Sequence, residues 1–478
     1  MSATYEAVIG LEIHIQLSTN TKMFCGCRLQ FGEPPNTLTC PVCLGHPGTL
    51  PVPNERAVRF AIAIGLALGC EIAPRSMFHR KNYFYPDLPK GYQISQFDVP
   101  ICSTGELAGV RIHRAHMEED AAKLIHVGES GRIHGAGRSV VDYNRGGTPL
   151  VEIVTEPDVH SGAQAREWLQ LLRATVKQLG VSDVNMEEGS LRCDANISIR
   201  PVGTTELGTK TELKNMNSFR FIERGIDAEI TRQTALLNAG EKVVQETLHF
   251  DPSTGSLTSL RSKEEAHDYR YFPEPDLVPV APSNELVEEI RASLPELPLQ
   301  KARRYEHDLG LAEDTARFLA FNSELGAYFE SVLAAAGGTP DVKRIGDWVT
   351  GELVARIGAD ADPAQSRVEA AALARLVALV VDKQITNAGA KTVLDELVER
   401  GGDPDAIVES KGLAAIDDSD ELAGIIDAAL AANPKAVDEL KGGKDRAIGA
   451  IIGFVMKQTQ GRADGGEVTR IVREKLDL

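Results

Sequence analysis

The sequence has no apolar run long enough to cross a membrane and no sign of a secretory leader. Its longest apolar run, residues 60–70, spans eleven residues, whereas a membrane helix needs roughly 20. The N-terminus lacks a cationic segment followed by an apolar one. Proline, serine and glutamine form no long tract of the kind that keeps a chain disordered. We therefore expect a folded, cytoplasmic protein that makes no membrane contact.

Positive charge is also scarce. The 478 residues carry 51 Lys and Arg against 69 Asp and Glu, a net charge of −18. This balance argues against nonspecific nucleic-acid binding by the whole surface, although it permits a local basic patch. The last 38 residues are the best candidate for phosphate contact, because they carry eight Lys and Arg against five Asp and Glu. A solvated helical tail with a chance surplus of cations remains the other interpretation.

Two segments alternate apolar and polar residues and predict strands. In residues 5–17 every odd position is apolar, so Glu12, His14 and Gln16 share the opposite face. Residues 191–200 repeat the pattern. Strands with one polar face are typical of antiparallel sheet. Between them, Ser161 and Gln164 form a capping box for a helix that should end near Gly180.

Beyond about residue 284 the alternation gives way to helical spacing punctuated by Gly and Pro. The sequence thus predicts an α+β protein with three parts. Residues 1–290 form a large domain of mainly antiparallel sheet, residues 291–404 an all-helical domain, and residues 405–478 a small helical tail. Residues 401–404, Gly-Gly-Asp-Pro, read as a linker before the tail.

Four of the seven cysteines form two close pairs joined by a short loop: Cys25, Cys27, Cys40 and Cys43. This arrangement favours a structural zinc ion, because each pair occupies one edge of a tetrahedron. Unmetallated thiols, an iron–sulfur centre, or His46 in place of one cysteine are the alternatives. The other three, Cys70, Cys102 and Cys193, are expected to be buried as small apolar residues.

Acidic residues gather in three places that a sheet could bring together. Glu12 and His14 share a strand face, Glu119 lies in the run His-Met-Glu-Glu-Asp, and Glu152 stands alone in an apolar segment. Carboxylates with few compensating cations suggest a hard divalent ion such as magnesium, which also contacts the phosphates of a nucleotide. A set of surface acids without a metal is the alternative.

Neighbouring segments are rich in groups that bind phosphate or carboxylate. The stretch Gly203 to Lys210 resembles a phosphate loop, but an extra Thr separates Gly208 from the lysine, so we reject that motif. No dinucleotide-binding GxGxxG is present either. The candidates for nucleotide binding are Lys81, Tyr83, Arg192, Asp194, Asn196, Lys210 and Lys214.

Several long, unusual strings in the first 276 residues resemble one family, the B subunits of bacterial aspartyl/glutamyl-tRNA amidotransferases (the GatB/GatE family). The strings are Val8-Ile-Gly-Leu-Glu-Ile-His14, Lys81-Asn-Tyr-Phe-Tyr-Pro-Asp87, Tyr92-Gln-Ile-Ser-Gln-Phe-Asp98, His116-Met-Glu-Glu-Asp120, Asn144-Arg-Gly-Gly-Thr-Pro-Leu150, Met186-Glu-Glu-Gly-Ser-Leu-Arg-Cys-Asp-Ala-Asn196, Leu213-Lys-Asn-Met-Asn-Ser218 and Asp268-Tyr-Arg-Tyr-Phe-Pro-Glu-Pro-Asp276. The helical remainder resembles that family's helical domain and tail through weaker motifs.

The resemblance implies a cradle-shaped catalytic domain and a tail that touches tRNA. It implies that ATP phosphorylates the glutamate or aspartate of a misacylated tRNA(Gln) or tRNA(Asn), and that ammonia then gives the amide. Magnesium would be held by Glu12, His14, Glu119 and Glu152, and zinc, as in some members, by the four paired cysteines. The partners in a heterotrimer would be an amidase (glutaminase) chain, which supplies ammonia, and a small third chain that bridges the two.

Two other classes of function remain open at this point. One is a noncatalytic, zinc-bearing scaffold that docks tRNA to another protein of the complex. The other is a synthetase that makes its own ammonia from glutamine, but the sequence has neither a Ser-Ser-Lys amidase signature nor a convincing Cys/His glutaminase set. The polar strand faces speak against the scaffold, because a scaffold has no need of clustered carboxylates.

Overall fold

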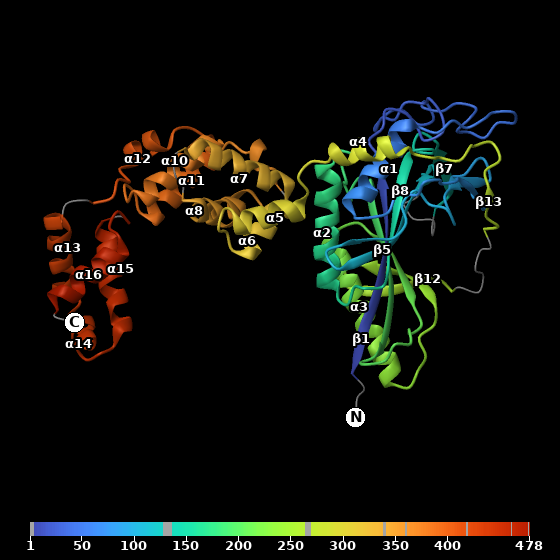
Figure 1. Cartoon of the computed structure of the whole chain (residues 1–478). Helices are drawn as coiled ribbons and strands as arrows, with labels where there is room; N and C mark the ends of the chain where they lie inside the picture. Colours follow the sequence, from blue (N-terminus) through green and yellow to red (C-terminus); the bar gives the residue numbers. More distant parts are fainter. Residues whose placement is uncertain are drawn as a thin grey trace. The chain divides into compact units, whose positions relative to one another are not determined.

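The computed structural model describes residues 4–127, 136–262, 269–337, 341–358, 361–416, 419–459, 461–476 and 478. Chain contacts divide it into two compact units, Met1–Leu297 and Pro298–Leu478. The first unit contains the sheets and the second is helical (Figure 1). The predicted α+β class, a mainly antiparallel-sheet domain followed by helices, is confirmed.

An eight-stranded sheet in the order β12-β11-β10-β9-β1-β8-β5-β4 forms the centre of the first unit. Its strands are β1 (Tyr5–Gln16), β4 (Gly105–Leu107), β5 (Val110–Glu119), β8 (Pro149–Thr155), β9 (Leu191–Pro201), β10 (Thr211–Met216), β11 (Glu246–Asp251) and β12 (Ser256–Ser262). All neighbouring pairs are antiparallel except β10 and β11. Strand β1 lies inside the sheet between β9 and β8, so its polar side chains have neighbours on both sides.

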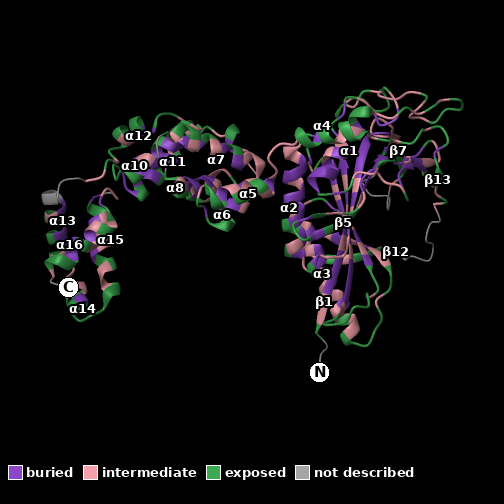
Figure 2. Cartoon of the chain, viewed as in Figure 1, coloured by how far each residue is buried: buried purple, intermediate pink, exposed green. Residues whose placement is uncertain are grey.

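One face of this sheet is apolar and covered by helices. Leu11, Ile13 and Ile15 of β1 are fully buried on that face, as the alternation predicted. The helices of the first unit are α1 (Glu55–Ala67), α2 (Gly162–Gln178), α3 (Phe219–Asn238) and α4 (Asn284–Ala292). Helix α3 packs on β9 and β10 while α1 packs on β5, and their buried sides face the sheet (Figure 2). The polar face is therefore the one left for a ligand.

The predicted helix caps are present. The Ser161 hydroxyl accepts a hydrogen bond from the Gln164 backbone N–H at 3.1 Å, and the Gln164 side chain accepts one from the N–H of His160 rather than Ser161. Gly180 has a φ of +66°, the left-handed conformation that ends a helix at low cost for glycine.

Two smaller sheets lie in the same unit: β13-β2-β3 and β6-β7. Their strands are β2 (His79–Asn82), β3 (Tyr92–Ser95), β6 (Lys123–Val127), β7 (Arg138–Asp142) and β13 (Phe272–Pro273). Strand β3 packs beside β5, which brings the three-stranded sheet to the β5 side of the main sheet. The cysteine loop precedes α1.

The second unit contains two separate clusters of buried apolar side chains. The first includes Tyr305, Phe329 and Trp348 and extends to Ile407; the second begins at Leu422 and ends at Val472. The helices are α5 (Pro298–His307), α6 (Glu313–Phe321), α7 (Ser323–Ala336), α8 (Val342–Asp347), the π-helical turn Trp348–Leu353, α9 (Val354–Ile357), α10 (Ala370–Val381), α11 (Asn387–Arg400), α12 (Pro404–Lys411), α13 (Ser419–Ala432), α14 (Pro434–Lys441), α15 (Ile448–Gln458) and α16 (Gly465–Lys475).

Helix α12 belongs to the first cluster, so residues 401–404 join two helices of one core. The break between the cores follows α12. The three-part division at residues 290 and 404 stays a prediction. Among the described residues, no helix is long and apolar enough to span a membrane.

Candidate functional site

Strand register places four polar side chains in one row across the open face of the main sheet. His14 of β1 is opposite Glu152 of β8 and Arg192 of β9, and Glu152 is opposite His116 of β5. Directly opposed residues on one face lie about 5 Å apart. Residues separated by more than a hundred positions in the chain thus meet in a line across β5, β8, β1 and β9.

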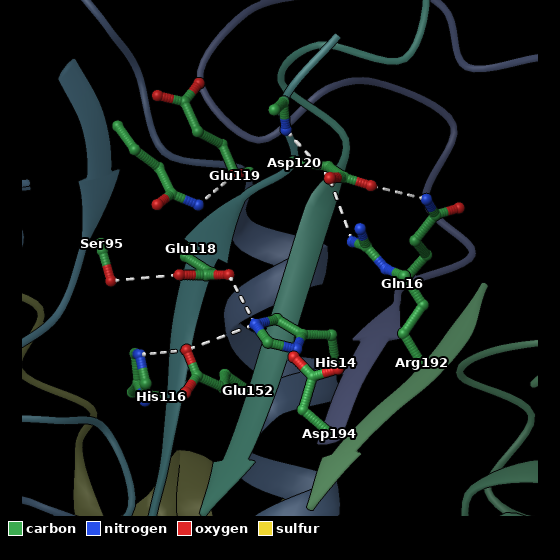
Figure 3. A network of polar contacts seen from close by, with 12 residues as sticks. His14, Gln16, Ser95, His116, Glu118, Glu119, Asp120, Glu152, Arg192 and Asp194 are labelled. Carbon is green, nitrogen blue, oxygen red and sulfur yellow. Dashed lines mark hydrogen bonds and ion pairs between the residues drawn. The ribbon is translucent and has the colours of Figure 1, made fainter. Parts of the chain in front are cut away.

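His14 lies between two carboxylates. Its Nε2 is 3.4 Å from an oxygen of Glu118 and 3.5 Å from an oxygen of Glu152, and His116 Nε2 contacts the same Glu152 oxygen at 3.3 Å (Figure 3). The Ser95 hydroxyl donates to the other Glu118 oxygen at 3.4 Å. We call His14, Glu118 and Glu152 the His–Glu cluster. Its members are 23%, 3% and 12% exposed, so only the imidazole edge is open to solvent.

These contacts fix the charges in the absence of a cation. Burial disfavours the imidazolium, but hydrogen bonds to Glu118 and Glu152 outweigh burial and raise the pKa of His14 to about 10. Burial also disfavours the Glu152 carboxylate, yet the charges of His116 and His14 hold the pKa of this carboxyl well below its usual range. In the absence of a cation, His14 is therefore positively charged and Glu152 negatively charged at neutral pH.

The His–Glu cluster suits a divalent cation. One ligand atom from each of its three residues lies within 4.8 Å of the others, close enough for a single ion to contact all three. Two carboxylates and an imidazole supply three ligands, and magnesium completes its coordination shell with waters and phosphate oxygens. A bound cation would take the place of the His14 proton.

Of the predicted magnesium ligands, the structure brings His14 and Glu152 together but places Glu119 elsewhere. Glu119 forms an ion pair with Lys90 and accepts the Ile94 backbone N–H at 3.0 Å. Its neighbour Glu118, not chosen from the sequence, faces His14 instead. Successive residues of a strand point to opposite faces, so only one of the two glutamates can reach the His–Glu cluster.

A shift of register in β5, between Ile112 and Arg114, sets which of the two glutamates faces His14. Before the shift the buried apolar residues are Val110 and Ile112; after it they are Ala115 and Met117. A β-bulge reverses which positions face the core. The sequence holds one usable signal, because apolar Ala115 and Met117 alternate with His116 and Glu118.

Glu12 lies one step along β1 from His14 and contacts a different group. Its Oε1 accepts a hydrogen bond from Asn196 Nδ2 at 2.8 Å, and in the register it is opposite Asp194. It borders a cavity of about 280 Å³ whose lining includes Gly10, Asn196 and Lys210. Glu12 therefore stands between the His–Glu cluster and this cavity.

Asp120, at the end of β5, is a second centre that the sequence analysis missed. Its carboxylate accepts a hydrogen bond from Gln16 Nε2 at 2.8 Å and pairs with Arg192 at 3.0 Å (Figure 3). It also lies 3.7 Å from Arg145. The carboxylate is 4% exposed, so burial makes these partners necessary. Asp120 thereby fixes the Arg192 guanidinium beside His14.

The remaining nucleotide-binding candidates fall on two sides of the His–Glu cluster. On the β9–β10 side, Lys214 pairs with Asp194 and Glu212, each at 2.9 Å, and Lys210 lines the 280 Å³ cavity. On the β5 side, the Lys81 ammonium lies over the Tyr269 ring, 4.9 Å from its centroid. Burial disfavours its charge, but Glu118 and other nearby groups outweigh burial and raise the pKa of Lys81.

Tyr83 also lies on the β5 side, with its ring centroid 6.0 Å from that of Tyr269. The adjoining motif residue Asp268 lies outside the described residues. The structure therefore separates Lys81 and Tyr83 from the candidates on β9 and β10.

The four paired cysteines converge as predicted. One sulfur from each of Cys25, Cys27, Cys40 and Cys43 lies within 4.8 Å of the other three. The buried Lys22 ammonium is 3.6 Å from Cys43 Sγ, and the Cys40 backbone N–H donates to the same sulfur at 3.2 Å. The hydrogen bond from Cys25 is the main cause that lowers the pKa of Cys43 to about 4. Four thiols around one point, one of them ready as a thiolate, fit a tetrahedral zinc ion.

A small cavity of about 80 Å³ lies between the cysteines and the ion pair of Glu119 with Lys90; its lining also includes Tyr92. It is distinct from the 280 Å³ cavity beside Glu12. The three cysteines outside the cluster are buried, at 6%, 0% and 2% exposure for Cys70, Cys102 and Cys193, as expected.

Comparison with known proteins gives full-length matches. Residues 7–288 match the family described as GatB/GatE catalytic domain, and residues 327–476 match the GatB domain. The chain is 51% identical over 481 residues to the B subunit of the aspartyl/glutamyl-tRNA(Asn/Gln) amidotransferase of Geobacter sulfurreducens. The proteins of the same name from Anaeromyxobacter sp. strain K and Carboxydothermus hydrogenoformans are 50% and 47% identical over 483 and 481 residues. Each match covers 99% of both chains.

Proposed function

The chain belongs to the GatB/GatE family, among the B subunits of aspartyl/glutamyl-tRNA(Asn/Gln) amidotransferases, and from this premise we propose that the His–Glu cluster is its catalytic centre. The chain functions in tRNA-dependent transamidation, a ligase reaction that forms a carbon–nitrogen bond. Our proposal is that it phosphorylates the side-chain carboxylate of Glu-tRNA(Gln) or Asp-tRNA(Asn) with ATP and then completes the amide.

The reaction needs phosphorylation because a carboxylate has no leaving group better than oxide. Transfer of a phosphoryl group to one carboxylate oxygen supplies such a group, and ammonia then replaces it at the carbonyl carbon with release of phosphate. Magnesium, when bound, offsets the charge of the triphosphate as it approaches an anion. The observation that supports this centre is the convergence of His14, Glu118 and Glu152 on the open polar face.

Each residue of the centre has a proposed task. His14, Glu118 and Glu152 hold the cation, and Glu12 orients the nucleotide from the next position of β1. His116 orients Glu152 through its Nε2 contact of 3.3 Å. Ser95 orients Glu118 in the same way at 3.4 Å. Such hydrogen-bonded partners of the ligands hold them in position for the cation.

ATP is proposed to lie beside Glu12, over β1 and β9, with its phosphates toward the cations of β9 and β10. The cavity of about 280 Å³ beside Glu12 is lined by residues of β1, β8 and β9, among them Gly10 and Asn196, and Lys210 also lines it. Arg192, held by Asp120 at 3.0 Å, presents its guanidinium toward the phosphates. Asp194 fixes Lys214 by a contact of 2.9 Å. The other two candidates, Lys81 and Tyr83, then face the acceptor side.

Ammonia is proposed to come from an amidase (glutaminase) chain, joined through a small third chain in a heterotrimer, because the sequence carries no glutaminase set of its own. The relatives are named as one subunit of an amidotransferase, which supports partner chains. Zinc at the four cysteines is proposed to be structural, since four protein ligands leave no open position. The cytoplasm remains the expected compartment, because aminoacyl-tRNA is consumed there.

The test uses the reconstituted complex with both misacylated tRNAs and compares Glu152→Gln with Glu156→Gln. Glu156 is the matched control, because its carboxylate lies just beyond β8 and pairs with the exposed His113 at 2.8 Å. We expect Glu152→Gln to abolish formation of the acyl phosphate, measured as tRNA-dependent release of ADP, while binding of deacylated tRNA persists. ADP release that survives Glu152→Gln would refute the centre and favour a noncatalytic scaffold.

A further inference from the structure

Aromatic side chains from three distant segments meet beside the His–Glu cluster. Phe97 and Tyr271 are stacked, with ring centroids 4.3 Å apart and planes 11° apart. Tyr271 meets Tyr269 edge to face at 6.1 Å, and Tyr269 meets Tyr83 at 6.0 Å. We call these four residues the aromatic cluster. Phe97 is 47% exposed, and the three tyrosines are half-buried.

The position of the aromatic cluster follows from the strands that hold it. Tyr83 follows β2, Phe97 follows β3, and the other two precede β13, all in the three-stranded sheet. Ser95 at the end of β3 contacts Glu118, and Phe97 is two residues, about 7 Å of extended chain, farther on. Burial raises the pKa of the Tyr271 hydroxyl, the charge of Lys81 lowers it, and the charges of Glu118 and Glu152 raise it. The cluster therefore borders the reacting centre on its β5 side.

A partly exposed group of aromatic rings beside a reacting centre suits a flat, uncharged ligand group. Single-stranded ends of RNA are bound in this way, because their unstacked bases stack on aromatic side chains. The amino acid of an aminoacyl-tRNA is esterified to the terminal adenosine. The ribose and the ester separate the base from the side-chain carboxylate, so the base must lie beside the reacting centre rather than on it.

We propose that the aromatic cluster stacks on the terminal adenine of the aminoacyl-tRNA and so places the amino acid over the His–Glu cluster. This inference rests on the proposed function. ATP also carries an adenine, but the cations proposed to bind its phosphates, Arg192 and Lys214, lie on β9 and β10, on the other side of β1 from β5. The two adenines thus enter from opposite sides, with the carboxylate and the γ-phosphate between them.

A binding cycle tests the proposal without turnover, using the complete amidotransferase complex and deacylated tRNA. Affinity is measured for tRNA with its full 3′ end and for tRNA lacking the terminal adenosine. In the wild type we expect loss of the adenosine to weaken binding about 5- to 100-fold, the contribution of one stacked base. In Phe97→Leu and Tyr271→Leu the same loss should have almost no effect, while Tyr271→Phe, which keeps the ring, should behave as the wild type.

Phe272→Leu is the matched control. Phe272 is adjacent in the chain and 43% exposed, but its ring lies under the Arg80 guanidinium at 5.8 Å. A terminal 2-aminopurine, whose fluorescence is quenched by stacking, gives a second readout. The proposal would be overturned if removal of the terminal adenosine weakened binding equally in Phe97→Leu and the wild type. It would also be overturned if the variants raised the KM for ATP without changing tRNA affinity, or if they prevented assembly of the complex. Failure of Glu152→Gln to stop ADP release bears on the proposed function alone, because the binding cycle involves no catalysis.

Discussion

Replacement of two adjacent glutamates, one at a time, by glutamine gives the sharpest test of the site. Glu118 and Glu119 differ by one position, yet the first contacts His14 at 3.4 Å and the second pairs with Lys90. Replacement by glutamine keeps the shape of each side chain and removes its charge. The two variants should therefore fail in different ways: Glu118→Gln in cation binding, and Glu119→Gln in stability.

The structure sets the expected magnitudes. Partners that only orient a metal ligand contribute about 10- to 100-fold to affinity, so loss of the charged Glu118 ligand should weaken divalent-cation binding by about 100-fold or more. Lys90 and Glu119 are 9% and 6% exposed, and breaking such a buried pair on one side costs about 3–5 kcal/mol. For a unit of this size we expect a fall in melting temperature of about 5–10 °C.

The assays separate the two effects. Manganese(II), followed by electron paramagnetic resonance, reports cation affinity without turnover. Unfolding of the first unit is followed by Trp168 fluorescence in a Trp348→Phe background, since these are the two tryptophans of the chain. As a control, Lys90→Met combined with Glu119→Leu should recover part of the lost stability. If Glu119→Gln weakened manganese binding while Glu118→Gln did not, the assignment of the two faces would be wrong.

Three further predictions concern the rest of the chain. Cys40→Ser should release zinc and lower thermal stability more than it lowers the rate of amidation; gently purified wild type with clearly less than one zinc per chain would contradict the zinc site. The isolated chain should not hydrolyse glutamine, and ammonia release from glutamine by this chain alone would contradict the need for an amidase partner. Deletion of residues 416–478, which removes the second helical core, should raise the KM for aminoacyl-tRNA more than it changes turnover. Its basic residues should make this contribution weaken with salt; an unchanged KM would move tRNA recognition to the first unit.

Local patterns in the sequence predicted much of the framework. The alternation of residues 5–17 predicted β1, observed as Tyr5–Gln16, and its polar face, because a strand must turn alternate side chains to opposite sides whatever surrounds it. The Ser161 cap and Gly180 delimited α2 for similar reasons, since they satisfy the backbone within a few residues. The cysteine pairs converge because their spacing is short, which makes the loop between them easy to close.

The composition of the reacting centre was decided by tertiary structure. Whether Glu118 or Glu119 meets His14 depends on the register shift in β5, and a shift of one residue exchanges the two faces of a strand. The same holds for Asp120, whose partners come from β1, β9 and the segment before β8. Pairing between strands far apart in the chain brings these groups together, and no local pattern encodes it. The sequence alone determined strands β1 and β9, the caps of α2 and the family resemblance; the register of the assembled sheet determined which carboxylates converge.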